Sequence, residues 1–196
     1  MWDKNLREVT LGGLLDEAVE KHPDNDAVIY VDRDFRLTYR EFGELVDQLA
    51  KGLMALGVQK GEKMAIWATN VPHWVAFQFA TAKIGAILLT VNTYYKSSEL
   101  EYILQQSDSE NLVIIDGFRD TDYVQTVYDL VPELKTQQRG NLKSKNFPSL
   151  KRVFFLGQEK HRGMYCLPEI MSLGPLVTDA EYVARQKELD AHDVVN

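Results

Sequence analysis

Three short polar groups stand directly after apolar runs of this chain: Thr69–Asn70, Asn92–Thr93–Tyr94 and Asp116–Gly117. Each apolar run has the length and composition of a strand that is buried on both faces. Hydroxyl, amide and carboxylate groups at the carboxyl ends of parallel strands can contact a small ligand, because ligands of open α/β sheets bind there. The pattern therefore predicts a cleft wall with five members: Thr69, Asn70, Asn92, Thr93 and Tyr94. Each member is equally typical of a helix cap or a turn.

Motifs that hold phosphates or activate a nucleophile are missing from the sequence. The nearest match to a phosphate loop, Gly52-x-x-x-x-Gly57, is followed by Val58 instead of lysine and lies within and at the end of a predicted helix. The sequence contains no G-x-G-x-x-G and no G-x-S-x-G nucleophile elbow. We therefore assign no catalytic residue and no cofactor-binding residue to this chain.

The spacing of a metal site is absent as well. The single cysteine, Cys166, has no thiol partner, and the four histidines are scattered: His22, His73, His161 and His192. The aspartate pairs at positions 32/34 and 120/122 lack the glycine and later glutamate of a calcium loop, so we interpret them as turn residues. His73 falls in the first turn of a predicted helix, where a local hydrogen bond is a simpler role than catalysis.

Composition places the chain among ordinary globular proteins. It has 196 residues, of which 45% are hydrophobic and 26% charged. A net charge of −7 argues against nucleic acid as a partner, because such a module needs a basic face, and it gives no support for membrane association. No internal disulfide is possible with one cysteine, and the first residues lack the apolar stretch of a signal peptide. These features favour a cytoplasmic protein.

The clearest structural unit is Lys63–Asn92, which has the pattern of a strand, a helix and a second strand. Asn70 can cap the helix, and Pro72 falls in its first turn, where a missing N–H costs little. Gly85 can take the left-handed conformation that ends the helix. The helix has almost no polar face. Its aromatic side chains are therefore interpreted, with that of the preceding strand, as core packing: Trp67, Trp74, Phe77 and Phe79.

Further helices are expected over 10–21, 38–56, 121–134 and 179–189, and one beginning at Ser97 or Ser98. Thr38 with Glu41, and Ser98 with Glu101, have the spacing of capping boxes. Strands are expected over 27–31, 112–115 and 153–156, and a turn or short helix over 165–173. Residues 135–147 are polar and lysine-rich, which predicts an exposed loop. The alternation of strands and helices predicts an α/β fold, a mostly parallel sheet with helices on both faces.

Several stretches, in this order, resemble the N-terminal part of AMP-forming acyl-CoA synthetases, which are adenylate-forming ligases. Leu37-Thr38-Tyr39-Arg40-Glu41-Phe42 is similar to the family's L-T-Y-x-E-L segment, and the run from Gly57 to Ile66 is similar to its G-V-x-x-G-D-x-V-A-I segment. The further matches are Asn70-x-Pro72-x-Trp74, the runs 82–86 and 98–104, and Pro148 to Val153 with Gly157. Asn92-Thr93-Tyr94-Tyr95 is more similar to fatty-acyl-CoA synthetases than to peptide-synthetase adenylation domains.

This resemblance implies that residues 1–196 are a single partial domain, cut before the loop that holds the ATP phosphates. For the longer protein it implies a ligase that uses ATP, Mg and coenzyme A to convert a fatty acid to acyl-CoA through an acyl-adenylate. The remaining part of its own chain would be its partner. The present piece would be a scaffold, inactive alone and without tight binding of these cofactors. Two alternatives stay open: a stand-alone α/β ligand-binding or interaction module, and a synthetase for aryl or short acids.

Overall fold

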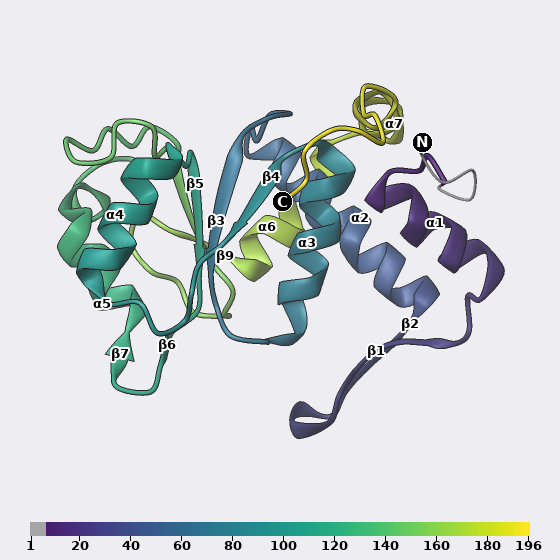
Figure 1. Cartoon of the computed structure of the whole chain (residues 1–196), viewed down its shortest axis with the longest axis horizontal. Coiled ribbons are helices and arrows are strands. Elements are labelled where there is room, and N and C mark those ends of the chain that lie inside the picture. Colours follow the sequence, from purple (N-terminus) through teal and green to yellow (C-terminus); the bar gives the residue numbers. More distant parts are fainter. Residues whose placement is uncertain (1–6) are drawn as a thin grey trace, which may run out of the picture.

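A five-stranded parallel sheet forms the centre of the computed structural model, which describes residues 7–196 (Figure 1). The strands lie in the order β4-β3-β5-β8-β9, and each neighbouring pair is parallel. Their bounds are β3 (Lys63–Trp67), β4 (Ile87–Thr90), β5 (Asn111–Ile114), β8 (Arg152–Phe155) and β9 (Tyr165–Cys166). Every residue of β5 is buried, as expected of a strand covered on both faces.

Helices cover both faces of this sheet, which confirms the predicted fold class. Figure 1 shows α4 and α5 on one side of the sheet and α3, α6, α2 and α1 on the other. The bounds are α1 (Leu11–Lys21), α2 (Tyr39–Ala55), α3 (Pro72–Ile84), α4 (Ser97–Ser107), α5 (Tyr123–Leu130) and α6 (Leu167–Leu173). A last helix, α7 (Asp179–Lys187), packs against α3. Within residues 7–196, no helix is both long enough and apolar enough to cross a membrane.

Two antiparallel hairpins lie at the lower side of Figure 1, one below α2 and one below α5. The first joins β1 (Asp26–Tyr30) to β2 (Phe35–Thr38) through the short 3₁₀ turn η1 (Val31–Arg33). The second joins β6 (Gly117–Phe118) to β7 (Thr121–Asp122). Two further 3₁₀ turns are η2 (Pro132–Lys135) and η3 (Gly174–Leu176). Residues 136–151 contain no helix or strand, although Ser144 and Phe147 within them are buried.

The aromatic side chains of the central unit belong to the core, as the sequence predicts. Trp67 and Phe77 are fully buried, and Trp74 and Phe79 pack against the same core with partial exposure. Trp67 stacks on Tyr123 of α5, with 3.5 Å between ring centroids. Together these rings join the helix layers to the strands, so they are not available as a cage for a ligand.

Gly52 has a packing role that explains why a glycine stands inside α2. A Cβ atom at this position would lie 2.1 Å from the backbone oxygen of Ile170, so only glycine lets α2 and α6 approach so closely. The G-x-x-x-x-G spacing therefore reflects helix packing, not phosphate binding. At the other end of the same helix, Thr38 and Glu41 form the predicted capping box.

Helix ends are where the sequence predictions fail. Asn70 is not the cap of α3: the N-cap residue is Val71, which makes no side-chain hydrogen bond to the helix. Ser98 and Glu101 do not form a capping box, because the N-cap of α4 is Lys96, two residues before Ser98, and Glu99 accepts from the Lys96 N–H at 3.0 Å. Gly85 does end α3 in the left-handed conformation, with φ of 75°.

Two elements differ in kind or length from the prediction. The helix expected over 121–134 ends at Leu130 as α5, and Pro132 begins a separate 3₁₀ turn because proline cannot donate to the preceding turn. The stretch from Tyr165 includes a strand as well as a helix: β9 pairs with β8 and extends the sheet by one strand before α6 starts.

Candidate functional site

Three loops at the carboxyl edge of the sheet enclose a cleft of about 360 Å³. They follow β3, β5 and β8, three strands that are neighbours in the sheet. Phe35 of the first hairpin closes one side. The other lining residues are Thr69, Val71, Pro72, His73, Ile115, Asp116, Gly117, Leu156, Gly157 and Gln158. The three segments are distant in the sequence, and the strand order brings them together.

The cleft lies where the strand connections diverge. From β3 the chain passes through α3 to β4, on one side, whereas from β5 it passes through α5 to β8, on the other side. When two adjacent parallel strands send their connections in opposite directions, the loops separate and leave a crevice at their carboxyl ends. This is the position at which ligands bind in open α/β sheets, and the structure places a cleft there.

Polar side chains in the cleft have few partners within the protein. Thr69 follows β3 and its backbone oxygen accepts from the Val71 N–H at 2.7 Å. The exposed Asp116 follows β5, and its backbone oxygen accepts from the Tyr123 N–H at 2.9 Å. Among the described residues, neither side chain makes a hydrogen bond or ion pair, so a hydroxyl and a carboxylate are available to a ligand. His73, by contrast, packs its ring edge-on against Phe35 at 5.7 Å between centroids.

Two glycines at the rim of the cleft are required by close contacts. A Cβ on Gly117 would lie 2.3 Å from the backbone oxygen of Thr121, and one on Gly157 would lie 2.3 Å from the Phe155 ring. Both contacts are far shorter than real Cβ atoms make. Small residues therefore let the β6–β7 hairpin and the β8 exit loop fold back tightly at this edge.

Of the five residues predicted for the cleft wall, the structure places only Thr69 among those that line the cleft. Asn70 lies next to it but lines a smaller, mostly apolar groove with Tyr30 and Trp74. The hydroxyl of Tyr30 donates to the backbone oxygen of Asn70, which ties the first hairpin to the exit loop of β3. Whether Thr69 contacts a ligand stays a prediction.

Asn92, Thr93 and Tyr94 follow β4, an end strand of the sheet, and lie outside the cleft lining. The side-chain oxygen of Asn92 accepts from the Tyr94 N–H at 2.9 Å, and its backbone oxygen accepts from the Trp67 indole at 3.2 Å. Thr93 accepts through its backbone oxygen from the Tyr123 hydroxyl at 2.6 Å. Burial raises the pKa of Tyr123 to about 12, so the hydroxyl remains a donor at neutral pH. These contacts hold the loop.

Sequence reasoning missed the third loop, Leu156–Gln158. The signal was present, since this loop also follows an apolar run, Val153–Phe155, and contains Gly157. It was not decisive because the sequence does not say that β8 lies beside β5. The same sheet order removes the β4 exit loop from the cleft, since β4 is separated from β5 by β3.

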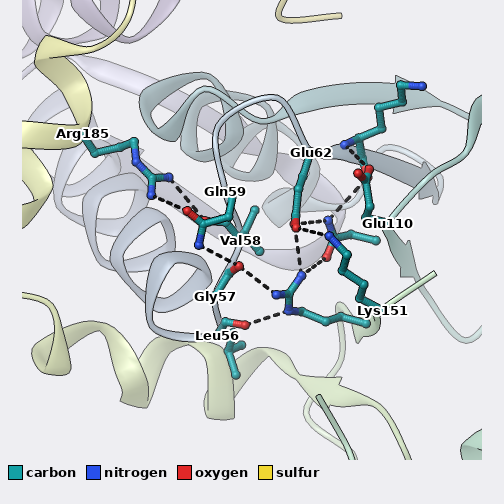
Figure 2. Close-up of polar contacts among 11 residues, drawn as sticks. Leu56, Gly57, Val58, Gln59, Glu62, Glu110, Lys151 and Arg185 are labelled. Carbon is teal, nitrogen blue, oxygen red and sulfur yellow. Dashed lines mark hydrogen bonds and ion pairs between the residues drawn. The ribbon is translucent and has the colours of Figure 1, made fainter. Parts of the chain in front are cut away.

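At the opposite, amino edge, the same three strands are held by a buried ionic network (Figure 2). Glu62 precedes β3, Asn111 begins β5 and Arg152 begins β8. Arg152 donates to Glu62 at 3.1 Å and to Asn111 at 3.2 Å, and it also donates to the backbone oxygens of Leu56 and Gly57 at 2.7 and 2.8 Å. The network fixes the register of β3, β5 and β8, and hence the spacing of the loops at the other edge.

Glu62 is the acceptor at the centre of this network. Its side chain is 7% exposed, and it accepts from Lys151 at 2.7 Å and from the Asn111 amide at 3.1 Å. Burial acts to raise the pKa of Glu62, but the hydrogen bonds from Lys151 and Asn111 and the charge of Arg152 outweigh it and lower the pKa below its ordinary value. The carboxylate therefore stays ionised and paired.

No group of three or more metal-type ligands occurs among residues 7–196. Cys166 is buried as a free thiol at the start of α6. In the described part of the cleft lining there is also no lysine or arginine. The cleft thus offers one carboxylate, one hydroxyl and one amide, a set suited to positioning a ligand and not to holding a metal ion or a polyphosphate.

Comparison with known proteins identifies the fold and its relatives. The sequence profile of the family described as "AMP-binding enzyme" matches residues 15–187, most of the chain. The chain belongs to this family. Over 187 residues it is 47% identical to the Bacillus subtilis protein named "Putative acyl-CoA synthetase YngI", covering 95% of the chain and 34% of that relative. It is 33% identical to the mouse mitochondrial medium-chain acyl-CoA ligase ACSF2, covering 99% of the chain and 32% of the relative.

Solved structures agree with this assignment. The chain is similar to a long-chain-fatty-acid-CoA ligase, FadD1, of Archaeoglobus fulgidus, with a TM-score of 0.66 and 26% identity over 86% of the chain and 30% of that structure. At 21% identity, an anthranilate CoA ligase with a TM-score of 0.68 shows the shared fold. The chain spans about a third of the length of the relatives it matches. Fold and family are therefore shown for an N-terminal portion of such proteins.

Proposed function

We propose that this chain is the N-terminal scaffold portion of a fatty-acid–CoA ligase. The longer protein converts a fatty acid, ATP and coenzyme A to acyl-CoA, AMP and pyrophosphate through an acyl-adenylate. The observation that carries this proposal is the 47% identity, over nearly the whole chain, to a relative named as an acyl-CoA synthetase. The position of the cleft at the carboxyl edge of the sheet supports it, since a substrate site is expected there.

Binding of ATP requires cationic groups that the described residues of the cleft do not supply. ATP carries its charge on a triphosphate, which needs cations and backbone donors close by. The described cleft residues include no lysine or arginine and place the carboxylate of Asp116 at the rim, so they do not fit a triphosphate. A single carboxylate also does not make a magnesium site. We therefore assign the holding of ATP, Mg and coenzyme A to the remaining part of the protein's own chain.

The role left to this portion is to form one wall of the substrate site. The ionic network at the amino edge holds three strands in register, and their opposite ends present Thr69, Asp116 and Gln158 to the cleft. We propose that Thr69 and Asn70 contact the rest of the assembled site, while Asn92 to Tyr94 only hold the β4 exit loop. The cytoplasm is the compartment we propose, because the one cysteine is a free, buried thiol.

The test is exchange of radiolabelled pyrophosphate into ATP, measured with and without added fatty acid. The longer protein is expected to catalyse exchange that depends on the acid, and residues 1–196 are expected to give only the background rate. Octanoate, palmitate and benzoate in parallel assign the substrate class. Exchange by the 196-residue chain would contradict the scaffold role. Absence of exchange with every fatty acid in the longer protein would contradict the ligase itself.

A further inference from the structure

Basic side chains are concentrated in one stretch of this acidic protein. Residues 135–162 contain eight lysines or arginines and one glutamate, whereas the rest of the chain contains 14 basic and 28 acidic residues. The stretch therefore carries a net charge of +7 against −14 elsewhere. Charge separated in this way creates a local positive potential that attracts anions. In Figure 1 the loop part of this stretch is the green trace at the upper left, beside α4 and α5.

Part of this basic charge borders an open groove of about 510 Å³ beside β9, the end strand of the sheet. Arg139, Lys160 and Arg162 line the groove together with one acid, Glu169. The groove lies next to the β8–β9 connection, whose earlier residue Gln158 lines the cleft described above. One loop thus separates the groove from the cleft, and the groove is a different site.

Glu169 neutralises only part of the charge in the groove. Arg139 donates to Glu169 at 2.8 Å, and the Lys160 ammonium lies 4.0 Å from the other carboxylate oxygen. Burial acts to raise the pKa of Glu169, but the hydrogen bonds from Arg139 and Cys166 outweigh it and keep the carboxyl ionised. Arg162 is exposed and has no ion-pair partner among the described residues. Three cations therefore face one anion, which leaves an excess of two positive charges.

The groove is held in place by contacts that do not depend on a ligand. Besides its bond to Glu169, Arg139 donates to the Met164 backbone oxygen at 3.1 Å and lies over the Tyr165 ring at 4.7 Å. Glu169 also accepts from the Cys166 N–H at 3.1 Å, at the start of α6. Gly163 has a φ of +81°, and a Cβ there would lie 2.3 Å from the Leu134 oxygen, so this turn is packed closely.

His161 adds an unusual polar atom to the groove lining. Its Nε2 is buried and has no hydrogen-bond partner among the described residues, and its ring meets Phe155 edge-on at 4.4 Å. A buried polar atom without a partner is uncommon, and each one calls for an explanation such as an ordered water, an ion or a functional role. The unpartnered His161 nitrogen and the excess of positive charge therefore occur in the lining of the same groove.

We propose that this groove binds the phosphate group of an anionic ligand, with Arg139 fixed in the wall and Lys160 and Arg162 closing on the phosphate oxygens. A phosphomonoester carries about the two negative charges that would neutralise this excess, and pyrophosphate carries more. The guanidinium groups offer the planar donor forks that match phosphate oxygens. The proposal does not rest on the ligase function, because neither the cleft nor catalysis enters it.

The first experiment titrates inorganic pyrophosphate into the 196-residue chain at low ionic strength, using isothermal calorimetry. Saturable binding at one site is expected, and Lys160→Ala with Arg162→Ala is expected to weaken it about tenfold or more, since two charge-assisted contacts are lost. The matched control is Lys143→Ala with Lys145→Ala, which removes the same charge from exposed positions of the basic stretch outside the groove. The control is expected to change affinity less than about twofold. Absence of saturable binding, or equal weakening by both pairs, would overturn the proposal.

A second variant tests whether the excess of positive charge in the groove determines its affinity for pyrophosphate. Glu169→Gln keeps an oxygen that can accept from the Cys166 N–H but removes the neutralising charge. Affinity for pyrophosphate is expected to rise several-fold, because the excess of positive charge grows from two to three. Circular dichroism and the urea midpoint check that the variant is folded. A folded Glu169→Gln protein that binds pyrophosphate more weakly would show that the charge argument is wrong.

Vesicle binding tests whether the phosphate that the groove binds belongs to a soluble ligand or to a lipid headgroup. Phosphatidylcholine vesicles are prepared with phosphatidic acid or with phosphatidylglycerol, which lacks a phosphomonoester. Binding to phosphatidic acid alone, displaced by pyrophosphate, supports the groove and assigns a headgroup. Pyrophosphate binding without vesicle binding supports the groove and assigns a soluble ligand. Equal binding to both lipids that survives Lys160→Ala with Arg162→Ala would contradict a phosphate-specific groove, because it would reflect general attraction to a charged surface.

Discussion

The two edges of the central sheet are formed by the opposite ends of the same three strands. Their polar side chains differ, because those at one edge are paired within the protein and those at the other edge are not. At the amino edge, Glu62, Asn111 and Arg152 satisfy one another and two backbone oxygens in a buried network. At the carboxyl edge, the side chains of Thr69 and Asp116 have no partner within the described residues and face a cleft. The contrast indicates that the amino edge serves stability and that the carboxyl edge is kept available for a ligand.

The largest effect is expected from removing the cation of the amino edge. Arg152→Met keeps most of the side-chain volume but removes the buried cation paired with Glu62 and the side-chain donor to the Leu56 backbone oxygen, which should lower the free energy of unfolding by about 3–5 kcal/mol. Lys151→Met is the matched control: Lys151 binds the same carboxylate but is 49% exposed, so about 1 kcal/mol or less is expected. Urea denaturation measures both. Similar losses in the two variants would show that burial does not distinguish them.

Acid should weaken the ionic network at the amino edge of the sheet. The pKa of Glu62 in the folded protein lies below its ordinary value of 4.5, so its stabilising contribution is present above that value and is lost as the pH falls through the folded pKa. Glu62→Gln is expected to lower stability at pH 7 and to flatten the acid side of the stability profile. Unfolding free energies between pH 7 and pH 3 test this. An unchanged acid slope in Glu62→Gln would mean that other carboxyls control it.

A smaller, steric effect is expected at the rim of the cleft. Gly157→Ala places a methyl group 2.3 Å from the Phe155 ring position, which is buried and cannot move freely. We expect a loss of about 1–3 kcal/mol, typical of overpacking, with a cleft that is locally distorted. Thermal unfolding and the chemical shifts of Thr69 and Asp116 report the two consequences. A neutral substitution would show that the β8 exit loop is looser than its contacts indicate.

The smallest stability effect is expected from the polar side chains of the cleft. Asp116→Asn makes the same chemical change as Glu62→Gln at the other edge, but it breaks no contact among the described residues and should alter the free energy of unfolding by less than about 0.5 kcal/mol. In the longer protein the same substitution is expected to reduce fatty-acid-dependent exchange. A marked loss of stability in Asp116→Asn would contradict the claim that only the amino edge uses its polar side chains to stabilise the fold.

Local sequence was sufficient for most of the elements, and the reasons are local. The capping box of Thr38 and Glu41 and the left-handed Gly85 depend on residues within one turn of each other. Prediction failed at Asn70 and Ser98, because the N-cap positions are Val71 and Lys96, residue types that a capping pattern does not single out. It also failed at β9, whose two residues are identified as a strand only by pairing with β8.

The sequence by itself determined that this chain folds as a parallel α/β sheet with a buried aromatic core, because hydrophobic periodicity and end signals are local properties. Only the tertiary structure decided which strand ends meet. By placing β5 between β3 and β8 and leaving β4 at the edge, it joined Thr69, Asp116 and Gln158 in one cleft and excluded Asn92 to Tyr94. It also paired Arg152 with Glu62 across 90 residues, because a buried charge must find its partner wherever the fold brings one.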